Sequence, residues 1–368
     1  MSADAPTYRI KPEHGPIRLS GNRIRLGGSV YGIGAEVVDR TGAVWTLLGA
    51  MDGTRTVDQI VEAVTAVHPD ERPDAVRAAV GLFVESGHVE DATAEVPAVL
   101  SDRDRERYDR SLRFYRWVDP VPRATSWDPQ VRLKQARVCL VGVGGTGGHA
   151  ALGLVASGVG ALHCVDADVV EWTNLNRQIL YGERDVGRPK VDVAAERLRH
   201  LNSDVAVTTA RDTVTGEADL RGLAAGCDVL LLCADRPSEI RVWANRACLA
   251  TGTPWIDAGY HGPMVTAAAY VPGDGPCYEC VWRAEYERHH AMGSEREYTV
   301  ERGDTNAVTA PSAGLSGQFA AHLAISLITG APPVHPGRLL GVNLVSPDHH
   351  VFLDDPRRPD CPACGEHE

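Results

Sequence analysis

The chain lacks the apolar segments that would send it to a membrane or out of the cell. Its first residues, MSADAPTYRIKPEHG, contain no apolar signal-peptide core. Its longest apolar stretches, such as the one around Val229–Ala234, are far shorter than the ~20 residues that span a bilayer. These absences predict a cytoplasmic protein that does not use a membrane as a partner.

Positive charge is also scarce. The 37 Lys and Arg residues are outnumbered by 49 Asp and Glu residues, which leaves a formal net charge of −12. General binding of nucleic acid, or docking on anionic lipid, needs an excess of basic side chains. Nucleic acid is therefore not an expected partner. Apolar residues, in contrast, are abundant and make up 43% of the 368 residues. Two or three domains, each with a core of its own, are therefore expected.

The sequence divides into three regions. Residues 1–95 contain two short alternating segments, RIRLGG and SVYGIG, and then helical patterns: one over Ala43–Leu48, one after the N-cap Thr56, and one that ends at Gly87. This order predicts a small winged-helix-like α+β domain. Residues 96–130 are charged and rich in Arg and Pro, which indicates a linker.

Residues 131–368 alternate strand and helix patterns. RVCLVGVGGTGG is a buried strand that leads into a glycine turn, and ALHCVDADVVE is a second strand that ends in carboxylates. A helix over Pro189–Leu201 and strands over Val205–Ala210 and Asp228–Ala234 follow. The alternation predicts an α/β fold with a doubly wound, Rossmann-like, mostly parallel sheet.

Two CxxC pairs stand out among the nine cysteines: Cys277 with Cys280, and Cys361 with Cys364. Four thiolates form the closed tetrahedral shell of a structural Zn²⁺ site, with no position left for catalysis. Free thiols or a disulfide are the alternatives. Because the pairs are far apart in sequence, zinc would fasten the C-terminal tail to the domain.

Four glycines lie between a predicted strand and a predicted helix: Gly142, Gly144, Gly145 and Gly147. Such a turn brings the backbone close to a phosphate, at the positive end of a helix. Asp166 and Asp168 follow about 20 residues later at a strand end, where a carboxylate can bind ribose hydroxyls. Up to this point NAD(P) remains as reasonable a ligand as ATP.

The next polar residues favour a triphosphate. The segments NLNRQ and GRPKV supply a cluster of phosphate-binding side chains, namely Asn174, Arg177, Gln178 and Lys190. Arginine binds phosphate oxygens in a bidentate manner and lysine adds a point charge. Asp235 ends the strand DVLLLCAD, and a lone carboxylate beside phosphates suits Mg²⁺.

With these motifs in order, followed by CYEC and CPAC, the region from about residue 105 to 366 resembles the ThiF/MoeB/ubiquitin-activating superfamily. The resemblance implies that Gly145 and Asp166 bind ATP and that Asp235 is associated with Mg²⁺. It assigns phosphate contacts to Asn174, Arg177 and Lys190. Arg236 follows Asp235 where the family usually has Asn or Asp, which departs from its pattern at the metal.

The resemblance also implies a homodimer, in which Arg110 of the RYDR segment reaches the partner subunit's ATP site. Many relatives transfer the acyl group to a cysteine after the first CxxC pair, but no cysteine occurs here between Cys280 and Cys361. The five other thiols, Cys233 among them, lie in predicted core segments, where thiols are usually inert. A thioester step is therefore not expected. The polar segment after Cys280, which includes Arg288, is predicted to be a substrate cover.

Residues 1–95 resemble the PqqD-like domains that recognise leader peptides during synthesis of ribosomally made, modified peptides. Such a domain adds the peptide as a strand to a sheet edge. Ile24, Leu26, Val30 and Tyr31 are predicted to lie near that edge. A DNA-binding winged helix is the alternative, and the acidic run from Glu85 to Glu95 disfavours it.

The resulting hypothesis is an adenylyltransferase that uses ATP and Mg²⁺ to activate a carboxylate of a precursor peptide. Arg110, Arg177, Lys190 and Asp235 would be its catalytic residues. Two alternatives remain at this stage. The protein could present leader peptides to a YcaO-type cyclodehydratase, or it could adenylate a sulfur-carrier protein.

Overall fold

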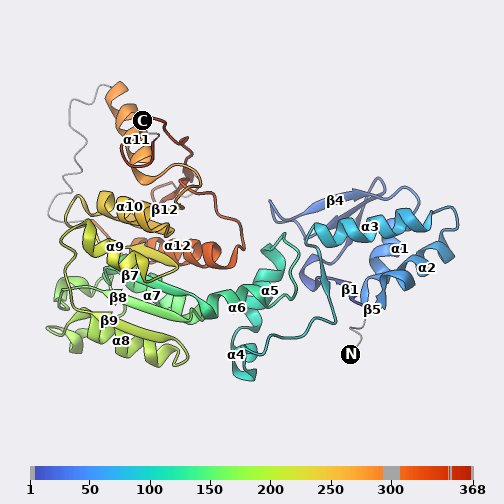
Figure 1. The fold of residues 1–368 in the computed structure, drawn as a ribbon, viewed down its shortest axis with the longest axis horizontal. Helices are drawn as coiled ribbons and strands as arrows, with labels where there is room; N and C mark the ends of the chain where they lie inside the picture. The colour runs from blue at the N-terminus through green and yellow to red at the C-terminus, as the bar shows by residue number, and fades with distance from the viewer. Residues whose placement is uncertain (1–4, 293–306, 347, 349, 366–368) are drawn as a thin grey trace. The chain divides into compact units, whose positions relative to one another are not determined.

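The computed structural model describes residues 5–292, 307–346, 348 and 350–365. The chain forms two compact units (Figure 1). One contains residues 1–132 with a short return at 329–332, and the other contains residues 133–328 and 333–368. None of the described helices is long and apolar enough to cross a bilayer.

Two small antiparallel sheets, three α-helices and one short 3-10 helix make up most of the N-terminal unit (Figure 1, blue). One sheet has the order β2-β3-β4 and the other β5-β1-β6. The strands are β1 (Thr7–Ile10), β2 (Ile17–Leu19), β3 (Arg23–Leu26), β4 (Ala35–Val38), β5 (Asp52–Thr56) and β6 (Val89–Asp91). The helices are η1 (Pro12–His14), α1 (Ala43–Ala50), α2 (Val57–Val67) and α3 (Pro73–Glu85). α4 (Asp102–Arg107), α5 (Asp109–Val118) and α6 (Asp128–Gln135) follow.

The helix ends follow from local chemistry. Thr56 caps α2, because its side chain accepts from the backbone N–H of Gln59 while the Gln59 side chain accepts from the Thr56 N–H. α3 stops just before Gly87, whose φ of +71° suits glycine. A Cβ at Gly87 would also lie 2.4 Å from the Pro120 carbonyl carbon. Both predicted helix boundaries are confirmed.

The predicted sheet edge is wrong. Ile24 and Leu26 lie on β3, the middle strand of its sheet, with exposed fractions of 2% and 1%. Val30 and Tyr31 are exposed, but they lie in the turn between β3 and β4. The segment SVYGIG forms no strand, because the glycines around it have positive φ and bend the chain. β2 and β4 are the edges.

An eight-stranded sheet forms the centre of the second unit, in the order β14-β13-β12-β11-β10-β7-β8-β9. The strands from β9 to β11 along this order run parallel, and β12, β13 and β14 are antiparallel. The strands are β7 (Arg137–Val141), β8 (Ala161–Val165), β9 (Ala206–Ala210), β10 (Val229–Leu232), β11 (Trp255–His261), β12 (Met264–Tyr270), β13 (Leu339–Asn343) and β14 (His350–Leu353). The helices are α7 (Gly145–Ser157), η2 (Trp172–Asn174), η3 (Glu183–Asp185), α8 (Lys190–Leu201), α9 (Glu217–Ala225), α10 (Ile240–Thr251), α11 (Tyr278–Ala291) and α12 (Ala310–Thr329).

Helices cover both faces of this sheet, as the doubly wound prediction requires. Val138 and Leu140 of β7 join the core under α7, α8 and α12, while Cys139 and Val141 of the same strand join the core under α9 and α10. β7 is therefore buried on both faces, which explains its continuous apolar sequence. The predicted fold class is confirmed.

The chain leaves β7 in one direction, to β8, and later returns to β10 on the other side of β7. This reversal creates a crevice at the carboxyl ends of β7 and β10, where open α/β sheets bind ligands. The first part of the predicted substrate cover belongs to helix α11, whose Arg288 forms an ion pair with Asp355, and its last residues form the start of α12. Residues 293–306 lie outside the described part of the chain.

Candidate functional site

A cavity of about 650 Å³ opens at this crevice. Ten of the residues predicted from sequence line it: Gly142, Gly144, Gly145, Asp166, Asp168, Asn174, Arg177, Gln178, Lys190 and Asp235. The structure thus gathers residues from five separate segments of the sequence. Arg110 belongs to the N-terminal unit, where its side chain is exposed on α5.

The glycine turn lets α7 begin very close to the end of β7. Gly142 has a φ of +89°, and a Cβ there would lie 2.8 Å from the backbone nitrogen of Ala234. Gly147 does not line the cavity, but a Cβ at that position would lie 1.9 Å from the Gly142 carbonyl oxygen. No side chain caps α7 at Gly144. The helix N-terminus therefore presents backbone N–H donors to an anion.

The two predicted carboxylates have different partners. Asp166 accepts from two backbone N–H groups, those of Val143 at 2.8 Å and of Asp168 at 2.9 Å. It thereby fastens the glycine turn to the end of β8. Asp168 instead accepts from the ammonium of Lys190 at 2.8 Å. That lysine side chain is 7% exposed, against 70% for Asp168.

Two side chains of the NLNRQ segment have buried atoms that a ligand can satisfy. The Arg177 guanidinium donates to the Thr173 carbonyl oxygen at 2.7 Å, but its Nε is buried without a hydrogen-bond partner among the described residues. Oε1 of Gln178 is in the same state. Buried polar atoms without partners are costly, and these two lie beside Gly144 and Gly145. The Arg177 Nε–H can donate to a phosphate oxygen, and Gln178 Oε1 can accept from a ligand donor such as a hydroxyl.

The wall of the cavity also contains residues that the sequence analysis did not predict. Arg241, from the first turn of α10, donates through Nε to both carboxylate oxygens of Asp257, at 2.9 and 3.1 Å. Arg236 and Tyr260 also line this wall. Arg241 lies at the start of α10, six residues after Asp235, and Asp257 lies on β11. The two meet because β11 pairs with β10, the strand that precedes α10.

The thiol nearest to the site is poorly suited to act as a nucleophile. Cys233 lines the cavity, and burial raises the pKa of its thiol well above the ordinary value. Burial likewise raises the pKa of Cys164 to about 12. Because the thiolate is the reactive form, neither residue is a good acyl acceptor near neutral pH.

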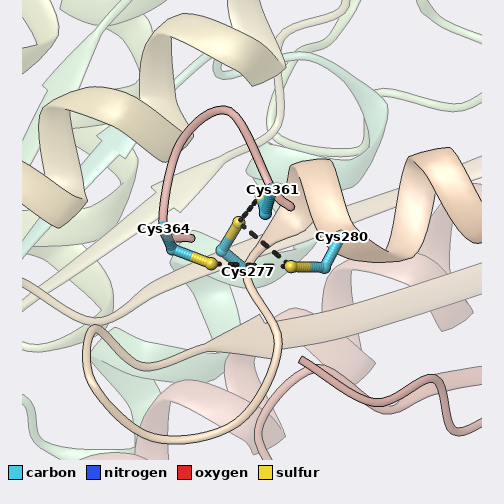
Figure 2. A group of neighbouring side chains, drawn as sticks. All are labelled: Cys277, Cys280, Cys361 and Cys364. Atoms are coloured by element: carbon cyan, nitrogen blue, oxygen red, sulfur yellow. Dashed lines mark hydrogen bonds between the residues drawn. The ribbon is translucent and has the colours of Figure 1, made fainter. Parts of the chain in front are cut away.

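The four paired cysteines converge as predicted (Figure 2). Cys277 and Cys280 come from the start of α11, and the other two come from the C-terminal tail. Their sulfurs lie within 4.8 Å of one another, with 3.6 Å between Cys277 and Cys361 and 3.5 Å between Cys280 and Cys364. Sulfurs around a tetrahedral zinc with Zn–S bonds of about 2.3 Å lie about 3.8 Å apart. The cluster therefore fits a structural Zn²⁺.

Different roles for the two aspartates lead to a prediction. Asp166→Asn is expected to lower ATP affinity about 10- to 100-fold. The substitution removes the negative charge of this carboxylate and so weakens its charge-assisted hydrogen bonds, which are worth about 1.5–3 kcal/mol. Asp168→Asn is expected to leave ATP affinity within about threefold of the wild type, since it removes only a competitor for the Lys190 ammonium. Calorimetric titration with ATP measures both values. Equal losses would instead show that both carboxylates bind the ribose.

Proteins of similar sequence cover about two thirds to three quarters of the chain. The sulfur carrier protein ThiS adenylyltransferase of Escherichia coli K12 is 36% identical over 234 residues, which are 63% of this chain and 84% of that protein. The molybdopterin-synthase adenylyltransferase of the same strain is 31% identical over 272 residues, 73% of this chain and all of that protein.

Solved structures of MccB match both units. E. coli MccB with ATP has a TM-score of 0.73 at 23% identity, and covers 97% of this chain and 99% of its own. The microcin biosynthetic enzyme MccB in complex with N-formylated MccA has a TM-score of 0.72 with the same identity and coverage. This likeness concerns the fold, including a counterpart of the N-terminal unit.

Fold and site together define an ATP-dependent adenylyltransferase. The chain belongs to the ThiF family, whose sequence model matches residues 108–363.

Proposed function

We propose that this protein adenylates a carboxylate of a ribosomally made precursor peptide, with release of pyrophosphate and without a cysteine thioester. The observation that carries the proposal is coverage: the sulfur carrier protein ThiS adenylyltransferase matches 63% of this chain, whereas the MccB fold covers 97% of it, including the N-terminal unit. An N-formyl group marks a newly translated bacterial chain, so the N-formylated MccA bound to MccB supports a ribosomal product as the substrate class.

The N-terminal unit offers a place for such a peptide. A cavity of about 330 Å³ lies between the end of β4 and helices α1, α2 and α3. Its walls include apolar side chains such as Val44, Leu47 and Val76, and β4 is an edge strand. An extended peptide added to that edge would gain backbone hydrogen bonds and an apolar groove. We assign leader binding to residues 1–95, a PqqD-like role, with residues 96–130 as the linker and 131–368 as the adenylation domain.

The chemistry needs little besides positioning and charge. A carboxylate oxygen of the peptide attacks the α-phosphorus of ATP, the bond to the bridging oxygen breaks, and pyrophosphate leaves with its electron pair. No general base is required, because the nucleophile is already an anion. Lys190 and Arg177 would stabilise the negative charge that develops on the phosphates. Asp235 would hold Mg²⁺, which neutralises the polyphosphate.

Arg110 has a separate place in the proposal. It lies exposed on α5 in the N-terminal unit. In a homodimer it would extend into the partner subunit's ATP site, as the resemblance to the superfamily implies. Loss of activity in Arg110→Ala that is restored by mixing with Lys190→Met protein would support such a shared site.

ATP–pyrophosphate exchange tests the function. We expect exchange in the presence of synthetic peptides encoded beside the gene, and almost none without peptide. The activated peptide should carry the mass of AMP, or should have lost water if the acyl group is captured internally. A matched peptide whose carboxylates are all amidated should support no exchange. Absence of exchange with every neighbouring peptide would contradict the proposal.

Sulfur-carrier activation is the second candidate, because the relative at 36% identity is named as the adenylyltransferase of the sulfur carrier protein ThiS. It predicts exchange with a ubiquitin-like carrier that ends in two glycines. Deletion of residues 1–95 separates the candidates: it should abolish activity on a peptide bound through its leader, but should spare activity on a folded carrier.

A further inference from the structure

Asn245 is a fully buried amide that connects α10 to the cysteine cluster. Its Nδ2 donates to the Sγ of Cys277 at 3.5 Å and to a carboxylate oxygen of Glu279 at 3.2 Å. Its Oδ1 accepts from the backbone N–H of Tyr278 at 3.1 Å. One side chain therefore fixes three successive residues, the turn on which the first two cysteines stand.

The first turn of α10 forms part of the wall of the nucleotide cavity. Ile240 and Arg241 both line it, and Arg241 pairs with Asp257 of β11. Arg241 and Asn245 are four residues apart, so they lie on the same face of the helix, about 6 Å apart along its axis. A shift of Asn245 would therefore be transmitted to the cavity wall within a single helical turn.

The cysteine turn contacts β11 as well. The ring of Tyr278 packs against Trp255, with centroids 5.9 Å apart, and Trp255 lies two residues before Asp257 on that strand. Both Trp255 and Asn245 are almost fully buried. The two elements that supply the Arg241–Asp257 pair are thus each packed against the residues between the first two cysteines.

We propose that the metal-binding cysteine cluster positions Arg241, which lines the nucleotide cavity and is held by Asp257, and that Asn245 is the positioning residue that links the cluster to Arg241. An amide N–H directed at a coordinating sulfur orients the ligand as well as the helix that carries the amide. Linkage then requires reciprocity: zinc raises nucleotide affinity, and nucleotide raises zinc affinity by the same factor.

The test is a zinc competition experiment on the full-length protein without any peptide, so its outcome is independent of the proposed substrate. A chromophoric chelator reports the Zn²⁺ affinity with and without a saturating ATP analogue that cannot be cleaved. We expect the analogue to raise zinc affinity at least fivefold, the lower end of the ~5- to 150-fold range of coupled sites. In Asn245→Ala the ratio of the zinc affinities with and without the analogue should fall below about twofold, and both of these affinities should be lower than in the wild-type protein. An unchanged zinc affinity in the wild-type protein would overturn the proposal.

Nucleotide would also protect zinc in a protein that loses its metal only by unfolding, so a matched control is needed. Asn202 is another buried amide, which donates to the Val155 carbonyl oxygen at 2.9 Å, away from the cysteines. Asn202→Ala should lose stability and keep the full ratio of zinc affinities.

If Asn245→Ala does not fold, Arg241→Gln serves instead. In this variant the ratio should fall, while the zinc affinity without nucleotide stays at the wild-type value. Full retention of the ratio in Asn245→Ala, or in Arg241→Gln, would contradict the role of α10.

Discussion

Lys190→Met is expected to lower the rate of adenylation about 100- to 1,000-fold, the usual cost of removing one preorganised charge from a site where negative charge develops. The Lys190 side chain is 7% exposed, whereas its partner Asp168 is 70% exposed and can turn toward water. Lys190 is also the first residue of α8, so its charge adds to the positive end of that helix. The polyphosphate would replace Asp168 as its partner.

The measurement is the peptide-dependent ATP–pyrophosphate exchange, with kcat and KM determined separately. The chain contains only three lysines, Lys11, Lys134 and Lys190. Lys134→Met makes the same chemical change on α6, outside the cavity, and should keep wild-type rates. Since methionine fills a similar volume, unfolding temperatures of both variants should stay near the wild type. A Lys190→Met enzyme within tenfold of the wild-type kcat would refute the role.

Sequence was a good guide where chemistry is local. The glycine turn, the carboxylates after β8 and the two CxxC pairs each occupy a short stretch of chain, and each requires particular residue types at fixed spacing. Their meeting in one cavity follows from the rule that parallel strands place their carboxyl ends at one edge of the sheet. Even so, the different partners of Asp166 and Asp168 depend on side-chain orientation, which spacing does not report.

Tertiary neighbours were harder to predict. Arg241 and Asp257 are paired because β10 lies beside β11, and no local pattern marks either residue. Strand order was also unreadable in the N-terminal unit, where the sequence of β3 looks the same for an edge strand as for a central one. The pairing of β3 with both β2 and β4 decides that question, and it moves the proposed peptide-binding edge from β3 to β4 or β2.

Gly147→Ala is expected to destabilise the nucleotide site by about 3 kcal/mol, the upper end of the cost of overpacking. The new Cβ would lie 1.9 Å from the Gly142 carbonyl oxygen, which is a backbone atom and not the end of a flexible side chain. α7 must therefore move away from β7, or the glycine turn must open. In either case the N–H groups at the start of α7 no longer point to one place, and about 3 kcal/mol corresponds to a loss of about 100-fold in ATP affinity.

Gly222→Ala provides the matched control for this substitution. Gly222 lies in the exposed part of α9, and a Cβ there would meet nothing within 4 Å. Alanine favours a helix over glycine by up to about 1 kcal/mol, so this variant should be slightly more stable than the wild type and should bind ATP normally. Chemical denaturation and calorimetric ATP titration of both variants give the comparison. If Gly147→Ala bound ATP as well as Gly222→Ala did, close approach of α7 to β7 would not be what forms the phosphate site, and the contacts of Arg177 and Lys190 would have to bind the nucleotide without the helix.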